Sequence, residues 1–210
     1  PSVSTIYRTI KAYPLNDKRK KAIKRYEKRY PGELLHADTY SLAKTMVENR
    51  KQHYLLGLID DCTRLCHVEL IDRNTSAEVS VATSKALKWF SVHGILPEVI
   101  MTDNGSEFTA YTSSKAKDIH FFETTLNMFN IKHIYTKPYR PQTNGKIERF
   151  WRILYNECIL CQTKTLTKDE LIAELDGFMY RYNYQRRHTS LKYRTPLDKL
   201  RSIAEMLPKL

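Results

Sequence analysis

Long apolar runs, a disulfide framework and a large glycine content are all missing from this 210-residue sequence. No apolar run approaches the roughly 18 residues that a membrane span needs. Residues 1–29 are polar and basic and lack the apolar segment of a secretory signal. Six glycines and eight prolines are too few for a fibrous or low-complexity chain. We therefore expect a globular, cytoplasmic protein that has no membrane contact and can bury a sizeable core.

The four cysteines do not predict a metal site. Cys62 and Cys66 form one pair and Cys158 and Cys161 another, and a four-thiolate zinc site would need both pairs to meet in space. Each pair lies in an apolar periodic segment, where cysteine serves as a small hydrophobic residue. We expect reduced thiols in or near the core, as in an intracellular protein.

Positive charge is concentrated in one short segment. The chain has a net charge of +12, and residues 18–29 contain eight basic side chains against Glu27 alone. Such a run is typical either of a solvated linker or of a patch that displaces counterions from nucleic acid. The run alone favours neither.

The order of the predicted elements indicates an α/β fold. Apolar and β-branched runs predict strands at residues 33–40, 53–61, 65–72, 98–102 and 131–135. Helical spacing and capping residues predict a short helix that ends before Pro14, helices over 75–94 and 120–129, and helices that begin near Gly145, Thr167 and Thr195. Three strands followed by alternating helices and strands predict a ribonuclease H-like mixed five-stranded sheet with flanking helices, plus a C-terminal helical extension.

Three acidic residues occupy positions where carboxylates carry chemistry. Asp38 lies within the first predicted strand, which is unusual because strands disfavour aspartate. Asp103 directly follows the buried strand 98–102, where open α/β sheets bind ligands, and Glu148 lies in the first turn of a helix, one residue off its apolar stripe, which points it at the sheet edge. Adjacent carboxylates repel each other, and Mg²⁺ with its preference for oxygen ligands relieves that repulsion.

Three strings resemble one known family. MTDNGSEF, IKHIYTKPYRPQTNGKIERFWRIL and YRYNYQRRHTSLKYRTPLDKL are similar to the catalytic core shared by retroviral integrases and bacterial insertion-sequence transposases, the D-D-E recombinase group. The resemblance runs from about Glu33 to Leu200. It implies that Asp38, Asp103 and Glu148 form a catalytic triad that binds Mg²⁺ or Mn²⁺.

Other acidic residues are weaker candidates for the same role. Asp60 and Asp61 match a recurrent acidic position of the group, and we treat them as structural neighbours, with Asp60 as the runner-up ligand. Glu107 and Glu123 lie outside the PQTNGKIER context and are less plausibly spaced. Forty-four residues separate Asp103 from Glu148, about ten more than the family usually has, and the excess lies in the polar segment AYTSSKAKDIH. Such an insertion costs little as a loop.

Polar and basic side chains around the proposed triad predict contacts with DNA phosphates. The alternative is an ordinary polar loop and helix surface, but phosphate contacts generally come from such groups near helix N-termini, which favours DNA binding. The predicted DNA-binding residues are Lys137, Tyr139, Arg140, Gln142, Asn144, Lys146, Arg149 and Arg152, of which Lys146 and Arg149 are the preferred phosphate contacts. The later stretch YNYQRRH could follow a nucleic-acid backbone or merely cap the helical extension.

The predicted organisation has three parts. Residues 1–30 resemble the end of a helix-turn-helix module with a basic linker, residues 31–163 form the integrase-like core, and residues 164–210 form the helical extension. Because the chain begins with Pro1, we expect it to be a piece of a longer protein that reads DNA ends elsewhere.

The predicted function is that of a DNA transposase or integrase. It would cleave a phosphodiester at the end of a mobile element and join that end to target DNA. Its partners would be element ends, target DNA and further copies of the chain, as a dimer or higher multimer, associated with a bacterial nucleoid. Two alternatives stay open: a ribonuclease H-like nuclease without joining activity, and an inactive DNA-binding remnant.

Overall fold

The computed structural model describes residues 2–12, 27–109, 120–136 and 144–206. Most of the basic run, nearly all of the predicted insertion and the loop residues 137–143 lie outside the described residues. None of the helices in the described ranges is both long and apolar enough to cross a bilayer.

A five-stranded mixed sheet forms the centre of the fold, as predicted. The strands are β1 (Leu35–Ser41), β2 (Tyr54–Asp60), β3 (Cys66–Ile71), β4 (Val99–Thr102) and β5 (Lys132–Tyr135). Their order across the sheet is β3-β2-β1-β4-β5. The first three strands are antiparallel neighbours, whereas β4 pairs in parallel with β1 and β5 in parallel with β4. The antiparallel meander followed by parallel crossovers confirms the predicted topology.

The predicted helices are present, with one local difference. They are α1 (Val3–Ala12), α2 (Ser76–Val92), α3 (Phe121–Met128), α4 (Gly145–Leu154), α5 (Lys168–Tyr180) and α6 (Pro196–Ala204). The apolar periodicity predicted one helix from Gly145 through Cys158, but after Leu154 the backbone widens into a π-helical turn at Tyr155–Ile159. A second π-helical turn, Arg181–Gln185, follows α5, and a short 3₁₀ turn lies at Thr189–Leu191.

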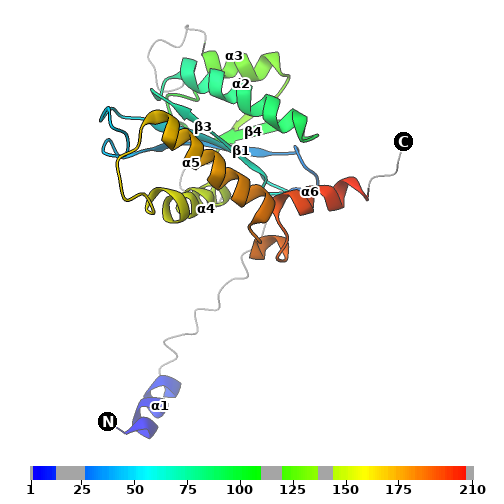
Figure 1. Ribbon diagram of the computed structural model, residues 1–210. Coiled ribbons are helices and arrows are strands. Elements are labelled where there is room, and N and C mark those ends of the chain that lie inside the picture. Colours follow the sequence, from blue (N-terminus) through cyan, green and yellow to red (C-terminus); the bar gives the residue numbers. More distant parts are fainter. Residues whose placement is uncertain (1, 13–26, 110–119, 137–143, 207–210) are drawn as a thin grey trace.

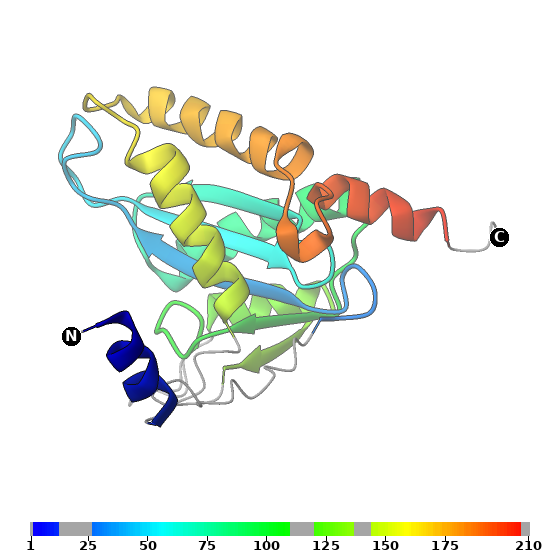
Figure 2. The same cartoon turned by 90° about the horizontal axis from the view of Figure 1, so that it is seen from below.

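Helices cover both faces of the sheet (Figures 1 and 2). On one face, apolar residues of β1, β2 and β4 pack against α2 and α3 in a cluster that contains Phe90 and Phe122. On the other face, a second cluster joins β2 and β3 to α4 and α5 and contains Phe150 and Phe178. Alternate residues of a strand point to opposite faces, so the sheet supplies both clusters from the same strands.

The C-terminal extension shares the second cluster with the rest of the fold. Leu171, Leu175 and Phe178 of α5 are buried against α4. The Asn183 side chain, 1% exposed, binds the backbone of the edge strand β3: its Oδ1 accepts from Cys66 N at 3.0 Å and its Nδ2 donates to Cys66 O at 2.8 Å. The side-chain amide of Asn183 thus satisfies the backbone N–H and C=O groups of the edge strand at Cys66.

The cysteine prediction is confirmed for three residues out of four. Cys62, Cys66 and Cys158 are buried free thiols, and burial raises the pKa of each of them. Cys161 is exposed instead, because it lies in the turn that follows the π-helical residues Tyr155–Ile159.

Candidate active site

One face of β1 is turned toward α4. His36, Asp38 and Tyr40 alternate with the residues that pack under α2, so all three point to the α4 side of the sheet. Tyr40 stacks on Trp151 of α4 with ring centroids 5.3 Å apart. Asp38, the only acidic residue of β1, therefore lies directly beneath this helix.

The parallel pairing of β1 and β4 brings Asp38 and Asp103 together. Leu35 pairs with Ile100 and His36 with Met101. The same offset, continued along both strands, places Asp103 beside Asp38 and on the same face. Asp103 follows the end of β4, and its Oδ1 accepts from the backbone N of Gly105 at 2.9 Å, which turns the chain away from the sheet. The two carboxylates thus meet at the carboxyl end of two adjacent parallel strands.

Asp38 is a half-buried carboxylate whose two oxygens are both held by hydrogen bonds. Its Oδ2 accepts from Trp151 Nε1 at 3.0 Å and its Oδ1 from its neighbour's backbone N at 2.9 Å. Burial, opposed by the Trp151 hydrogen bond and reinforced by the charge of Asp103, raises the pKa of Asp38 to about 6. Among the described residues, no Lys, Arg or His forms an ion pair with Asp38 or Asp103.

A glycine makes room for the indole that holds Asp38. Gly57 of β2 lies opposite Asp38 in the antiparallel register. A Cβ at Gly57 would lie 2.6 Å from Cη2 and 2.7 Å from Cζ2 of Trp151, much closer than carbon atoms normally pack. Sequence reasoning missed both residues, although a glycine inside a strand is a recognised sign of close approach by another group.

Glu107 also lies near the two aspartates. Its Oε1 accepts from Thr39 Oγ1 at 2.9 Å and from Asn74 Nδ2 at 2.8 Å. A Cβ at Gly105 would lie 2.6 Å from Glu107 Oε2 and 3.0 Å from Asp103 Oδ1, so both carboxylates border the same small space. The sequence spacing had made Glu107 a weak candidate, whereas the turn after β4 folds it back toward the site.

Glu148 is exposed on the first turn of α4. Its neighbours Ile147, Phe150 and Trp151 form the buried face of that helix. The offset from this face had predicted that Glu148 points at the sheet edge, but its side chain is exposed to solvent. It precedes Trp151 by three residues and so lies one turn from the indole that binds Asp38. Within the described ranges, no three His, Cys, Asp or Glu side chains are grouped closely enough to hold a metal ion.

The described residues among the predicted DNA contacts have different surroundings. Arg149 and Arg152 are exposed on α4. Asn144 is 9% exposed, and its Oδ1 makes no hydrogen bond within the described part of the chain. Lys146 is half-buried and donates to Asp61 Oδ1. Lys137, Tyr139, Arg140 and Gln142 lie outside the described residues.

Asp60 and Asp61 anchor the turn after β2. Asp60 is fully buried, and its oxygens accept from Gly32 N, Thr63 N and Thr63 Oγ1. Burial raises the pKa of Asp60. It pairs with Leu35, three residues along β1 from Asp38, so it stands apart from the carboxylate pair.

Asp61 joins three segments of the chain. It binds His36 Nε2 at 2.8 Å, the Lys146 ammonium group and the backbone N of Lys28 at 2.7 Å. Burial opposes its charged form, but the hydrogen bonds from His36 and Lys146 outweigh burial and lower the pKa of Asp61. The Asp61 carboxylate therefore fixes the start of α4 relative to β1.

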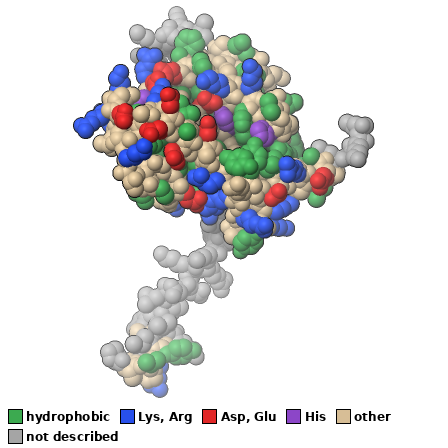
Figure 3. Space-filling model, viewed as in Figure 1, with side chains coloured by type: hydrophobic (Ala, Val, Ile, Leu, Met, Phe, Trp, Pro, Cys, Tyr) green, Lys and Arg blue, Asp and Glu red, His purple; other side chains and the backbone are tan. Residues whose placement is uncertain are grey.

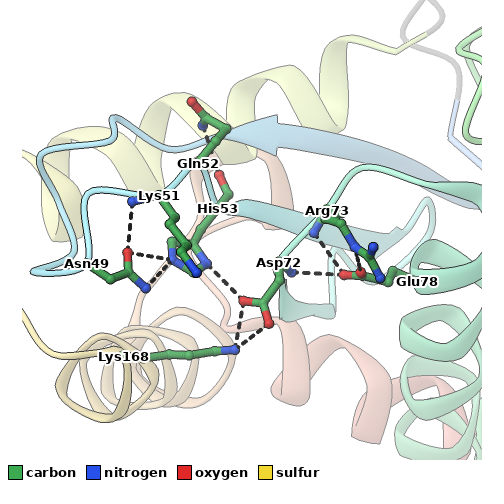
Figure 4. Close-up of polar contacts among 8 residues, drawn as sticks. All are labelled: Asn49, Lys51, Gln52, His53, Asp72, Arg73, Glu78 and Lys168. Atoms are coloured by element: carbon green, nitrogen blue, oxygen red, sulfur yellow. Dashed lines mark hydrogen bonds and ion pairs between the residues drawn. The ribbon is translucent and has the colours of Figure 1, made fainter.

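A separate pocket lies beside the start of β2 and the end of β3 (Figure 4). Its volume is about 530 Å³. Asp72 binds Lys168 Nζ at 2.7 and 2.8 Å and His53 Nδ1 at 2.9 Å, and Glu78 binds Arg73 Nε at 2.6 Å. Each acidic group here has a cationic or histidine partner, which is typical of a structural ion-pair network. The Asp38–Asp103 pair has no such partner among the described residues and is the better candidate for chemistry.

The sequence was compared with the profiles of known protein families. The sequence matches two family profiles, both described as "Integrase core domain". One covers residues 29–141, more than half of the chain, and the other covers residues 129–196. The matched ranges include Asp38, Asp103 and Glu148.

Individual proteins with similar sequence or structure are integrases or parts of integrase complexes by their names. "Putative integrase ORF3" of Spiroplasma virus SpV1-C74 is 34% identical over 190 residues, which are 88% of this chain and 52% of that protein, so the chain spans about half of this relative's length. A chain of the simian T-cell lymphotropic virus intasome, solved with the PP2A regulatory subunit B56 gamma, has a TM-score of 0.63 at 20% identity, over 88% of this chain and 58% of that one. The HTLV-2 integrase catalytic core domain in complex with magnesium has a TM-score of 0.58 at 20% identity, over 80% of this chain and 96% of that one. At such identities the structural likeness establishes the fold, the ribonuclease H-like fold of integrase catalytic cores.

Proposed function

The chain belongs to the integrase core domain family, and from this premise we propose that it cleaves a phosphodiester at the end of a mobile DNA element and joins the freed 3′-hydroxyl to target DNA. The observation that carries the proposal is the pairing of Asp38 with Asp103. It is supported by the register of β1 and β4, in which the two aspartates occupy matching positions of adjacent parallel strands, and by the absence of an ion pair between either of them and a described basic residue.

This donor set fits a hard divalent cation. Carboxylate oxygens are the ligands that Mg²⁺ prefers, and a pair of uncompensated carboxylates favours cation binding. We assign Asp38, Asp103 and Glu148 as the residues that would hold Mg²⁺ or Mn²⁺. When bound, such ions activate a water or hydroxyl group and stabilise the leaving oxygen of an in-line phosphoryl transfer.

The chain's own residues position these groups. Trp151 and the backbone of Thr39 fix the two oxygens of Asp38, while the Gly105 amide fixes Asp103. Preorganised groups of this kind supply much of the catalysis in phosphoryl transfer, because the reaction needs little covalent chemistry from the protein. Glu148, exposed one turn before Trp151, completes the triad in this proposal.

DNA would lie along the exposed side of α4. Arg149 and Arg152 would contact phosphates there, together with Lys137, Tyr139, Arg140 and Gln142 of the preceding loop and Asn144 and Lys146 at the start of the helix. We further propose a dimer or higher multimer, because two element ends must be joined, and a location with the DNA of a bacterial cell. Residues 1–30, 31–163 and 164–210 would be a DNA-reading end with its linker, the catalytic core and the helical extension.

Strand joining by an Asp103→Asn variant tests the proposal. The protein is supplied with pre-cut, labelled element ends, a plasmid target and Mg²⁺ or Mn²⁺, and covalent attachment of label to plasmid is measured. We expect joining by the wild type and none by Asp103→Asn, with an unchanged thermal unfolding midpoint, because Asp103 is exposed and its loss leaves the core intact. Normal joining by the variant would show that the site is wrongly assigned.

The same samples separate the two alternatives. Cleavage of element ends without joining by the wild type would favour a ribonuclease H-like nuclease. Calorimetric titration with Mn²⁺ addresses the inactive remnant: heat that depends on Asp103 supports the metal site, whereas its absence in the wild type favours a protein that only binds DNA.

A further inference from the structure

The net positive charge of this chain is concentrated in two segments. Residues 18–29 carry +7 of the net +12, and residues 181–201 contain seven Lys and Arg against Asp198 alone, which is +6. The remaining residues together have a formal charge of −1. The second segment runs from the end of α5 into α6 and contains none of the proposed catalytic carboxylates.

Several cations of this second segment are exposed and unneutralised. Arg186 binds Glu157 through two nitrogens, and Lys199 lies 3.9 Å from Glu27. In contrast, the exposed residues Arg181, Arg187, Lys192 and Arg201 form no ion pair within the described ranges. Figure 3 shows Lys and Arg side chains gathered at the lower part of the body, around the junction of α5 and α6.

Two of these cations converge around one acidic residue. Hydrogen bonds from Thr195, aided by the nearby charges of Arg201 and Arg187, lower the pKa of Asp198. Arg187 and Arg201 therefore each lie close enough to Asp198 to act on its charge, although they are fourteen positions apart in the chain. A single carboxylate does not balance two guanidinium groups together with Lys192.

The turn between Arg187 and Thr195 is held rigidly. His188 is 6% exposed, binds Tyr182 O at 3.3 Å through Nε2, and accepts from Tyr193 N at 2.9 Å through its carbonyl oxygen. Leu191, 2% exposed, anchors the middle of the turn in the core. Thr195 then begins α6 with a capping box.

The tip of this turn has an unusual backbone. Lys192 and Tyr193 have φ of 55° and 62°, a left-handed conformation that Gly and Asn adopt more easily than residues with longer side chains. Both side chains project outward, and Tyr193 is 66% exposed. Residues in such strained conformations are concentrated where binding needs a fixed geometry.

We propose that Arg187, Lys192, Tyr193 and Arg201 form a second DNA contact surface, which binds the phosphate backbone of duplex DNA away from the catalytic carboxylates. The inference rests on the proposed function for the identity of the partner. The proposal is supported by the charge of the segment, by the preorganised turn and by the aromatic side chain that lies among cations. This combination is typical of surfaces that bind nucleic-acid backbones. The segment that carries this surface leaves the sheet at Asn183, which binds Cys66 at the start of β3, the end of the sheet where β1 begins, whereas Asp103 follows the end of β4.

The test compares two triple variants that each remove three positive charges. The first is Arg187→Ala/Lys192→Ala/Arg201→Ala, and the control is Lys44→Ala/Lys88→Ala/Lys132→Ala, at exposed positions elsewhere. Binding of a labelled duplex is measured by anisotropy over a series of salt concentrations. Each lost phosphate contact lowers the slope of log K against log salt by about 0.9. We expect the first variant to lose about 2 to 3 from the slope and at least about tenfold in affinity at 0.1 M salt, and the control to lose much less.

The outcomes distinguish this inference from the proposed function. If the wild type joins DNA ends but both triple variants bind duplex DNA alike, the second surface is refuted while the proposed function stands. If the first variant loses affinity for duplex RNA but keeps it for duplex DNA, the inference is also refuted. If Asp103→Asn abolishes joining and retains the wild-type salt slope, whereas the first variant has the reduced slope, catalysis and binding at this surface are separate, as proposed.

A second substitution addresses the rigidity of the turn. Lys192→Asn removes the charge and places a residue that tolerates the left-handed conformation. We expect a higher thermal unfolding midpoint together with weaker DNA binding. Unchanged binding in this variant would count against Lys192 as a contact.

Discussion

Gly57→Ala should damage the candidate active site through one added methyl group. The new Cβ would lie 2.6 and 2.7 Å from two ring carbons of Trp151, whereas such atoms normally approach to about 3.5–4.0 Å. The indole must therefore retreat by about 1 Å. It is enclosed by Tyr40 and Phe150, with ring centroids at 5.3 and 5.0 Å, so α4 has to move with it.

Two measurable effects follow from this displacement. Overpacking of this kind costs about 1–3 kcal/mol of unfolding free energy, which exceeds the gain of about 0.5–1 kcal/mol expected from replacing a strand glycine. The hydrogen bond from Trp151 to Asp38, now 3.0 Å, would lengthen past the useful range. Because a misplacement of 1 Å can cost about 100-fold in rate, we expect strand joining to fall by about that factor.

Urea denaturation and the plasmid-joining assay measure the two effects. Gly145→Ala is the matched control, since a Cβ there meets nothing within 4 Å, and it should leave stability and joining unchanged or slightly improved. Trp151→Phe removes the ring atoms in conflict, so the destabilisation by Gly57→Ala should shrink in that background. An undiminished penalty in the double variant, or wild-type joining by Gly57→Ala, would refute the close contact as the cause.

Three further perturbations test other parts of the structure. Trp151→Phe alone removes a hydrogen bond that favours the charged form of Asp38, so the pKa of that carboxyl should rise above about 6 in the metal-free protein, as read by carbon NMR; a lower value would contradict the contact. Asn183→Ala leaves two buried backbone groups of Cys66 unsatisfied and should cost about 2–4 kcal/mol in urea denaturation, and Asn183→Asp should also destabilise because its carboxylate faces a carbonyl; wild-type stability of either would contradict the edge-strand role. The folded-state pKa of Asp61 is lowered, so its stabilising contribution is complete above the unfolded pKa of about 3.9 and is lost as the pH falls below it. Asp61→Asn should therefore be less stable than the wild type at pH 7, with the difference narrowing below about pH 4.

Local sequence patterns determined the elements of this protein and their order. Alternating apolar runs, capping boxes such as Thr167 with Glu170, and the turn after Asp103 are all encoded within a few residues, and the structure has the corresponding strands, caps and turn. The periodicity did not reveal the π-helical turn after Leu154, because a change in backbone hydrogen bonding leaves the apolar spacing almost unaltered.

The composition of the site was decided only by the tertiary structure. Sixty-four residues lie between Asp38 and Asp103 in the chain. The two are brought together by the parallel register of β1 and β4, which no local sequence pattern specifies. The return of Glu107 toward the site, the pairing of Lys146 with Asp61 and the indole over Gly57 likewise arise from contacts between distant segments. Secondary structure follows short-range periodicity and capping, whereas the charges and contacts of a site depend on how strands pair and how helices pack on them.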